Sequence, residues 1–232
     1  MSNTTKLLAI GLAAVTMLAS GVRHVSAAFV VNGSFEDTTN FVPIADDTMP
    51  LVVGSTAMTG WTVVGNSPIA WIGPTNPFGL TASNGNYFLD LTGYSDDSPN
   101  FGGVSQTIPT TPGATYALSF DLGSSTTYNP SGTAGITSTA TATVGNTTQT
   151  FNFTTTSANA WTTETMFFTA TSNLSSTLIT IQGSTGVKYI GLDNVSVNAV
   201  AVVPEPASLV VWSLLGLGCV SVCWWHWRQR AV

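Results

Sequence analysis

Histidine, cysteine and lysine are nearly missing from the long central part of this 232-residue chain. Both histidines, His24 and His226, and both cysteines, Cys219 and Cys223, lie near the two ends. The region between them therefore cannot build a Ser-His-Asp or Cys-His catalytic site, a zinc site of imidazole or thiolate ligands, or a disulfide. Only carboxylate chemistry remains open to it.

Charge of either sign is also scarce. Charged residues make up 7% of the chain, and the net charge is −6. Lys188 is the only basic residue between positions 29 and 198, and Glu205 is the only one of the eleven acidic residues outside that range. A domain of this charge repels phosphate backbones, so nucleic-acid binding is disfavoured.

The first 28 residues are typical of a signal peptide. Lys6 supplies the positive start, and an apolar run over 7–18 is too short to span a membrane comfortably. Small residues near Ala28 predict cleavage there, with Phe29 as the first mature residue, and Ala27 offers an alternative site.

The C-terminus predicts a membrane anchor. Residues 199–206 form a short linker, and 207–225 form an uncharged apolar run long enough to cross a hydrocarbon core of about 30 Å as a helix. Residues 226–232 carry Arg228 and Arg230, which mark this tip as cytoplasmic.

One motif makes the anchor more specific. Pro204-Glu205-Pro206 stands directly before the apolar run, and the basic tip closes the chain. This order resembles the PEP-CTERM sorting signal of Gram-negative bacteria. The resemblance implies processing by a membrane-embedded exosortase and delivery to the cell surface or the extracellular matrix, although two arginines among tryptophans are a sparser basic end than usual.

Residues 29–198 predict one all-β domain. Apolar and polar residues alternate over Tyr116–Leu122 and over Thr139–Val144, and no segment shows a sustained helical stripe. Further short β-branched and aromatic runs occur at Gly60–Val64, Ile69–Ile72, Tyr87–Leu91, Val104–Ile108, Gln149–Phe153, Thr163–Thr169, Ser176–Gln182 and Tyr189–Val197. About ten strands in one domain of this length indicate a two-sheet antiparallel sandwich.

Several short motifs follow one another along this domain. They are Phe29–Glu36, Gly60-Trp61, Trp71–Gly73, Asn84–Leu91, Gly102–Thr107, Pro112–Tyr116, Ser119–Leu122, Trp161-Thr162 and Leu192–Val197. In this order they resemble the bacterial choice-of-anchor C domain, a relative of the plant cell-wall DUF642 family. More distantly the domain is similar to carbohydrate-binding modules with a galactose-binding-like jelly roll, which implies fold more firmly than ligand.

Glu36 and Asp193 form the first candidate site, a structural calcium site. Asp193 shares its alternation phase with Val195 and Val197, which predicts that it points inward, and a buried carboxylate requires compensation. Calcium bound by both carboxylates would provide it, as at the equivalent junction in the modules that the domain resembles. Backbone amides or Lys188 are the alternative, which makes a simple hydrogen-bonded corner.

The second candidate site is a loop that combines aromatic rings with polar side chains. Sugars stack their C–H faces on rings and bond through their hydroxyls to Asp and Asn. The residues predicted to contact such a ligand are Trp71, Tyr94, Asp96, Asp97, Asn100 and Phe101. The alternative is a solvated polar turn above core aromatics.

No pair of carboxylates is marked out for glycoside hydrolysis, so we expect no enzymatic activity. Two functions remain open. One is non-catalytic binding of a polysaccharide, either an exopolysaccharide or a cell wall. The other is a structural or adhesive matrix protein without a defined sugar site, which the Ser/Thr-rich composition and the scarcity of charge favour.

Overall fold

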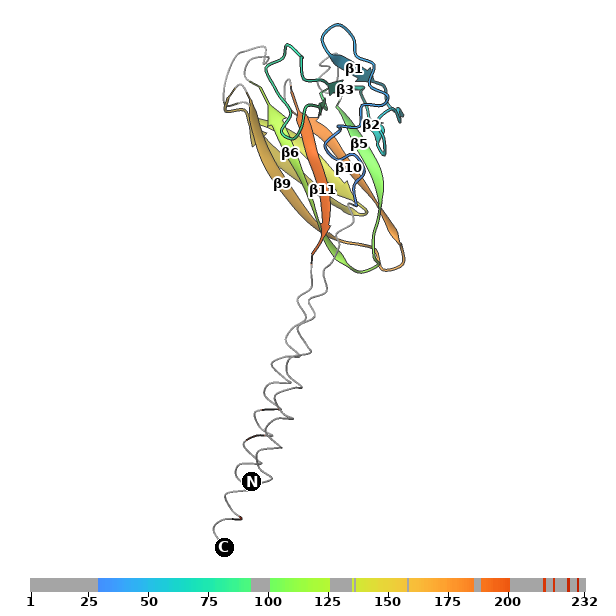
Figure 1. The fold of residues 1–232 in the computed structure, drawn as a ribbon, viewed down its shortest axis with the longest axis vertical. Coiled ribbons are helices and arrows are strands. Elements are labelled where there is room, and N and C mark those ends of the chain that lie inside the picture. The colour runs from blue at the N-terminus through green and yellow to red at the C-terminus, as the bar shows by residue number, and fades with distance from the viewer. Residues whose placement is uncertain are drawn as a thin grey trace, which may run out of the picture.

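The computed structural model describes residues 29–92, 101–125, 135, 137–157, 159–185, 189–200, 215, 219, 225 and 229. The described part of the domain contains eleven β-strands in two sheets (Figure 1). Every strand pair is antiparallel, which confirms the predicted all-β sandwich.

The larger sheet has six strands in the order β1-β3-β4-β11-β6-β9. Their bounds are β1 Thr48–Leu51, β3 Ile69–Ile72, β4 Phe88–Asp90, β11 Gly191–Ala199, β6 Thr115–Ser124 and β9 Ala160–Thr169. The smaller sheet has five strands in the order β2-β5-β10-β7-β8. Their bounds are β2 Thr62–Gly65, β5 Gly102–Pro109, β10 Ser176–Thr185, β7 Thr137–Val144 and β8 Thr147–Thr154.

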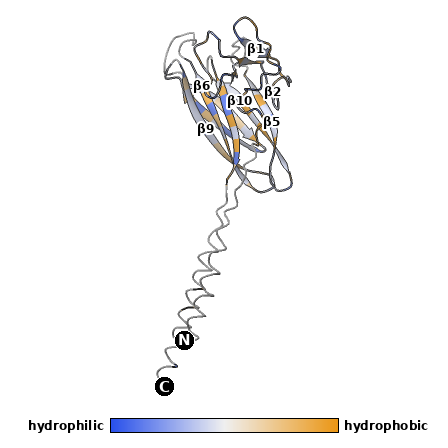
Figure 2. Ribbon diagram, in the orientation of Figure 1, coloured by the Kyte–Doolittle hydropathy of each residue, from blue (hydrophilic) through white to orange (hydrophobic). Residues whose placement is uncertain are grey.

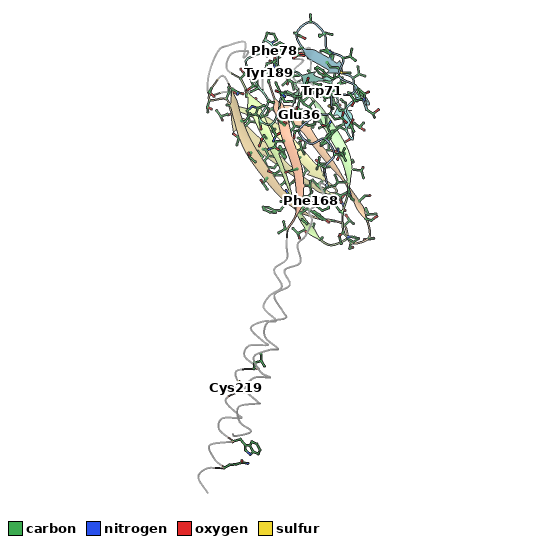
Figure 3. The ribbon with its side chains drawn as sticks, viewed as in Figure 1. Glu36, Trp71, Phe78, Phe168, Tyr189 and Cys219 are labelled. Carbon is green, nitrogen blue, oxygen red and sulfur yellow. The ribbon has the colours of Figure 1, made fainter. Side chains whose placement is uncertain are left out.

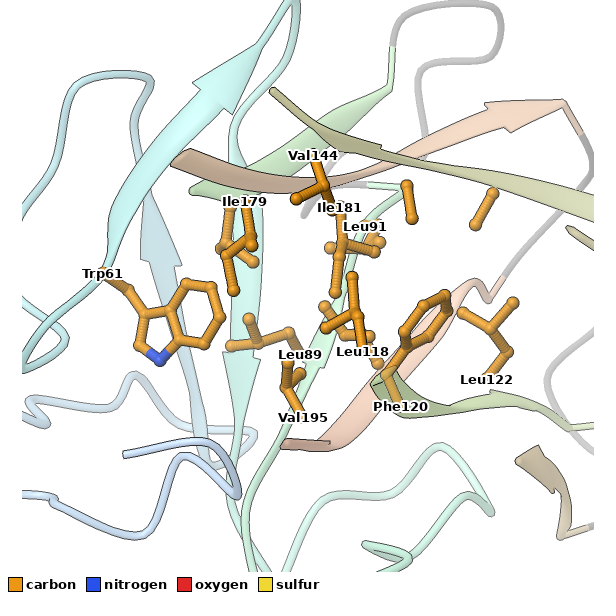
Figure 4. Packing of buried hydrophobic residues seen from close by; sticks show 14 of the residues in the cluster. Trp61, Leu89, Leu91, Leu118, Phe120, Leu122, Val144, Ile179, Ile181 and Val195 are labelled. Atoms are coloured by element: carbon orange, nitrogen blue, oxygen red, sulfur yellow. The ribbon is translucent and has the colours of Figure 1, made fainter. Parts of the chain in front are cut away.

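The core lies between the two sheets and follows from the period of two along each strand. On β6, Leu118, Phe120 and Leu122 point inward and are fully buried, while the polar residues between them face outward. They belong to one core cluster with Ile179 and Ile181 of β10 and with Trp61, whose indole lies at the side of the cluster near Ile179 and Leu89 (Figure 4). In Figure 2, apolar and polar residues intermix along β6, β9 and β10 as this alternation requires.

The outer face of the six-stranded sheet has a cover of its own. The segment between β3 and β4 folds over it, and Phe78 and Leu80 of this segment pack with Phe88 and Tyr189 in a second apolar cluster. Trp161 packs against the same cluster and donates from Nε1 to the carbonyl of Thr81 at 2.8 Å. This sheet is therefore buried on both faces over part of its area.

The first and last described residues of the domain, Phe29 and Val200, both lie beside the start of β6. The ring of Phe29 meets that of Tyr116 edge-on with centroids 5.3 Å apart, and the amide of Val200 donates to the carbonyl of Thr115 at 2.8 Å. In Figure 3, Glu36, Trp71, Phe78 and Tyr189 lie at the opposite end of the sandwich from Phe168, which stacks on Tyr116.

The predicted signal peptide, the Pro204-Glu205-Pro206 motif and most of the predicted anchor lie outside the described residues. Of the anchor and tip, only Leu215, Cys219, Trp225 and Gln229 are described, each in helical conformation. Among the described residues, no helix has the length and apolar character needed to cross a membrane.

Strand β1 is the one described strand that the sequence did not predict. Its residues Thr48–Leu51 include Pro50, which cannot donate to a ladder and lowers the strand signal. Pro50 is tolerated because β1 is an edge strand that pairs only with β3.

Candidate functional site

Glu36 fixes a tight turn that precedes β4. Its Oε1 accepts hydrogen bonds from the amides of Asn86 and Tyr87, both at 2.7 Å. Gly85 lies against the carboxylate with φ +77°, and a Cβ there would come within 2.4 Å of the Glu36 Cδ. The turn thus needs glycine both for its conformation and for this close approach.

Asp193 holds the same turn from the other side. It is completely buried, and its carboxylate accepts from the amide of Asn84 at 2.8 Å and from that of Asn194 at 2.6 Å. The two predicted metal ligands therefore do meet at one structural feature, the turn 84–87, but each binds its own backbone amides.

The predicted inward orientation of Asp193 is wrong. Asp193 pairs with Asp121 of β6, whose neighbours Phe120 and Leu122 point inward, so both carboxylates lie on the outer face. The register shifts between Asp193 and Ser196, where Asn194 adopts φ +51°. This bulge inserts one residue and reverses the phase that Val195 and Val197 suggested. Asp193 is buried because the turn 84–87 covers that face.

Asp121 completes the cluster and was not singled out from the sequence. Its carboxylate accepts from the hydroxyl of Ser83, from Thr163 Oγ1 at 2.6 Å and from Asn194 Nδ2 at 3.1 Å. The alternation along β6 predicts that Asp121 points outward, but its burial results from the covering segment between β3 and β4, which the sequence does not reveal. Three carboxylates, Glu36, Asp121 and Asp193, thus hold Ser83–Tyr87 in place, and we call this group the acidic clasp.

Burial raises the pKa of Asp193 to about 7, and the negative charge of Asp121 contributes in the same direction. Hydrogen bonds from the backbone amides of Asn84, Asn194 and Ser83 oppose this rise, because they stabilise the ionised form. The acidic clasp therefore contains a carboxyl group that changes charge near neutral pH.

The arrangement of the clasp does not fit a shared calcium shell. Glu36 and Asp193 direct their oxygens at N–H donors, whereas calcium requires six to eight oxygen ligands around one point. Among the described residues, no group of three or more His, Cys, Asp or Glu side chains is placed to hold a metal ion. The geometry matches the alternative of a hydrogen-bonded corner, and calcium binding stays a prediction. Lys188 lies outside the described residues.

The predicted sugar-binding loop divides into three parts. Trp71 is fully buried, and its Nε1 donates to the carbonyl of Phe35 at 3.2 Å, so its ring is closed to a ligand, contrary to the prediction. Phe41 and Tyr87 pack edge-on against it. Phe101 is also buried, with 5% of its surface exposed in the main core cluster, so its ring is not open to stack on a sugar either, contrary to the prediction. The remaining residues, Tyr94, Asp96, Asp97 and Asn100, lie outside the described residues.

Phe101 lines an open depression of about 220 Å³ near the end of β10, the central strand of the five-stranded sheet. The other lining residues are Asn66, Thr141, Gln182, Gly183 and Ser184. Gln182 Nε2 and the amide of Asn66 both donate to the Phe101 carbonyl, at 3.2 and 3.1 Å. These contacts fix the floor of the depression.

Beside the depression, glycine allows β5 and β10 to approach closely at Gly103. Gly103 of β5 lies between Gln182 of β10 and Val64 of β2, where any other residue would extend a side chain outward. A Cβ at Gly103 would lie 2.5 Å from the Ile181 carbonyl oxygen, so the backbones approach too closely for any other residue.

The same face continues as a charge-free surface. None of β2, β5, β7, β8 and β10 contains a charged residue. One row of hydroxyl side chains crosses all five strands, and the strand register places its members side by side. The row consists of Thr148, Thr143, Thr180, Ser105 and Thr62, of which Ser105 is buried. We call this surface the hydroxyl face.

The protein is thus a small antiparallel β-sandwich in which strands of one sheet carry charged residues and the strands of the other carry none. Residues 28–198 match the family model described as a protein of unknown function, DUF642. The chain belongs to the DUF642 family, which confirms that part of the resemblance seen in the sequence. No curated protein matches the sequence.

The chain is also similar to solved carbohydrate-binding modules. TmCBM61 in complex with β-1,4-galactotriose is 17% identical, with a TM-score of 0.47 over 75% of this chain and all of that one. A family 16 module is 16% identical, with a TM-score of 0.41 over 73% and 99% of the two chains. The CBM22-1 xylan-binding domain of Paenibacillus barcinonensis Xyn10C is 18% identical, with a TM-score of 0.41 over 66% and 92%.

Proposed function

We propose that the sandwich binds a neutral polysaccharide without cleaving it, and that the hydroxyl face around the Phe101 depression is the binding surface. The observation that carries this proposal is the absence of charge from all five strands of that sheet. Sugar hydroxyls both donate and accept hydrogen bonds, and so do the side chains of Thr, Ser and Gln on this face.

The dimensions of the face suit a chain of several sugar units. Neighbouring strands lie about 4.8 Å apart, so the hydroxyl row from Thr148 to Thr62 spans about 19 Å. None of the five described strands of this sheet carries a cation that could pair with a uronic acid, and the chain has a net charge of −6. Both facts favour a neutral glycan over an acidic one.

The proposal includes no catalytic step. Hydrolysis requires two carboxylates that flank the scissile bond, roughly 5 to 10 Å apart. None of the described lining residues of the depression carries a carboxylate. Tyr94, Asp96, Asp97 and Asn100 precede Phe101 in the sequence and remain predicted ligand contacts.

Affinity electrophoresis of the purified protein in gels that contain neutral or acidic polysaccharides tests this function. We expect a neutral polysaccharide to retard the protein and an acidic one to leave its mobility unchanged. Retardation by acidic polysaccharides alone would overturn the neutral assignment, and retardation by none would favour the structural alternative.

Threonine-to-valine substitutions then locate the surface, because they keep side-chain shape and strand propensity while they remove the hydroxyl. The pair Thr143→Val and Thr180→Val should weaken binding at least tenfold, or about 1.4 kcal/mol. The matched control is Thr165→Val with Thr169→Val, both exposed on β9 of the other sheet. Equal binding by both double variants would exclude the hydroxyl face.

We further propose that the protein is exported and sorted to the cell surface or extracellular matrix. Signal peptidase would remove residues 1–28, the apolar run 207–225 would hold the intermediate in the inner membrane, and an exosortase would act at Pro204-Glu205-Pro206. The supporting observation is the order of motif, apolar run and basic tip. Mass spectrometry of the surface fraction should find a chain that lacks both terminal segments. Full-length protein retained in the inner membrane of the native host would contradict the processing.

A further inference from the structure

The two sheets present four edge strands, and three of them carry features that discourage pairing with another chain. Natural sheets block their edges with short strands, proline, or charged residues that point inward. β1 and β2 have four residues each, and β1 contains Pro50. β9 is long, but Glu164 lies opposite the core residue Phe120 and so points inward.

The fourth edge strand, β8, has none of these features. It has eight residues, Thr147–Thr154, with no charge, proline or glycine. It pairs with β7 from Val144↔Thr147 to Thr137↔Thr154 without a register shift, so no bulge twists it away from a partner. Among the described residues, no hydrogen bond reaches the backbone groups on its outer edge. The part of the chain that the structure describes thus leaves these groups available to continue the ladder.

We propose that β8 pairs antiparallel with β8 of a second copy of this chain, and so joins the two five-stranded sheets into one continuous sheet. This inference does not depend on the polysaccharide proposal. An edge strand related to itself by a two-fold axis is necessarily antiparallel, and each copy offers the other the same free N–H and C=O groups.

The sequence of β8 suits pairing with itself. Two copies of a charged strand would bring like charges together, and β8 has none to oppose. Residues opposite each other must share a face, so the buried Phe151 and Phe153 of each copy would extend one apolar layer. On the other side, Thr148, Thr150 and Asn152 would extend the hydroxyl face across both copies.

Sedimentation equilibrium of the purified full chain, with a pair of matched double variants, tests the proposal. Thr150→Lys with Asn152→Lys places ammonium groups opposite each other when pairing is centred on residue 150 or 151. We expect the wild-type chain to form dimers, and this variant to dimerise with a dissociation constant at least tenfold higher. The control is Thr141→Lys with Thr139→Lys on β7, the cross-strand neighbours of the same two positions, which should dimerise as wild type does.

Hydrogen exchange provides a second readout that needs no variant. Amides in 147–154 should become more protected as protein concentration rises, while amides in 160–169 on β9 should not change. Monomers at all concentrations, equal dimerisation of both double variants, or protection of β9 alone would each overturn the proposal. Protection of 147–154 that requires a different added protein would show that the edge binds a different chain.

Discussion

The buried carboxyl of Asp193 should make the stability of this domain fall as pH rises from about 4 to about 7. Its pKa is raised from an ordinary value of 3.8 to about 7 in the folded protein. Between these two values the unfolded chain has released the proton and the folded chain still holds it. The folded state binds more protons there, so the free energy of unfolding decreases with pH. The stabilisation that protonated Asp193 contributes to the folded state is fully present below pH 4 and is lost above pH 7.

A shift of about three pKa units corresponds to about 4 kcal/mol, which is a large part of the stability of a typical domain. The assay is urea denaturation at closely spaced pH values in the presence of a chelator, on wild type and Asp193→Asn. Titrating groups away from Asp193 contribute equally to both proteins, so the difference between the two unfolding free energies isolates Asp193 together with its coupling to Asp121.

The variant carries a cost that does not depend on pH. An amide accepts hydrogen bonds through one oxygen only, so one of the two N–H groups from Asn84 and Asn194 loses its acceptor, at about 1 to 3 kcal/mol. Against this constant cost, the variant should gain about 4 kcal/mol relative to wild type as pH rises from 4 to 8. A difference that is independent of pH, or one that grows in favour of wild type, would refute the reasoning. If the variant does not fold, NMR titration of the wild-type carboxyl measures the same pKa directly.

Three further predictions concern the clasp and its surroundings. Glu36→Ala should destabilise the domain by about 2 kcal/mol and increase hydrogen exchange at 84–87, because two amides lose a charged acceptor; unchanged exchange there would contradict this role. Gly123→Ala should destabilise by about 2 to 3 kcal/mol in thermal melts, since its Cβ would lie 2.5 Å from the Trp161 ring, and a Gly123→Ala, Trp161→Ala double variant should lose less than the sum of the two changes. If calcium binds, a chelator lowers the melting temperature, and calcium at 100 times its dissociation constant restores about 2.7 kcal/mol of folding stability. Equal melting temperatures with and without chelator would support the alternative of a hydrogen-bonded corner without calcium.

Most of the sandwich was predictable because its strands are amphipathic over several residues. The alternation over Tyr116–Leu122 and Thr139–Val144 identified β6 and β7 directly. β1 was missed because it is short and contains proline. Its strand conformation depends on pairing with β3 and not on an alternating pattern of its own.

The candidate sites were less predictable, because they depend on contacts between distant segments. A single bulge at Asn194 reversed the expected direction of Asp193, and alternation along one strand cannot reveal a bulge. Trp71 stands near Gly73 and Pro74 in the sequence, which suggested a loop, but Phe35 and Phe41 from the N-terminal segment enclose it. The charge-free composition of the five strands was visible in the sequence, whereas their gathering into one sheet was not.

The positions of the depression and of the C-terminal end of the domain, at opposite ends of β11, have a mechanical consequence. Gly183 at the depression lies close to Ile190, just before β11 begins, and Val200, just after β11 ends, is the last described residue of the sandwich. Under the proposed polysaccharide binding and C-terminal anchoring, a pull between the polymer and the anchor would run along β11, which lies between β4 and β6. Force in that direction loads the backbone hydrogen bonds with both neighbours in shear, so that they share the load instead of opening one after another. The strand that would connect to the proposed anchor is thus also the one held by neighbours on both sides against being pulled out.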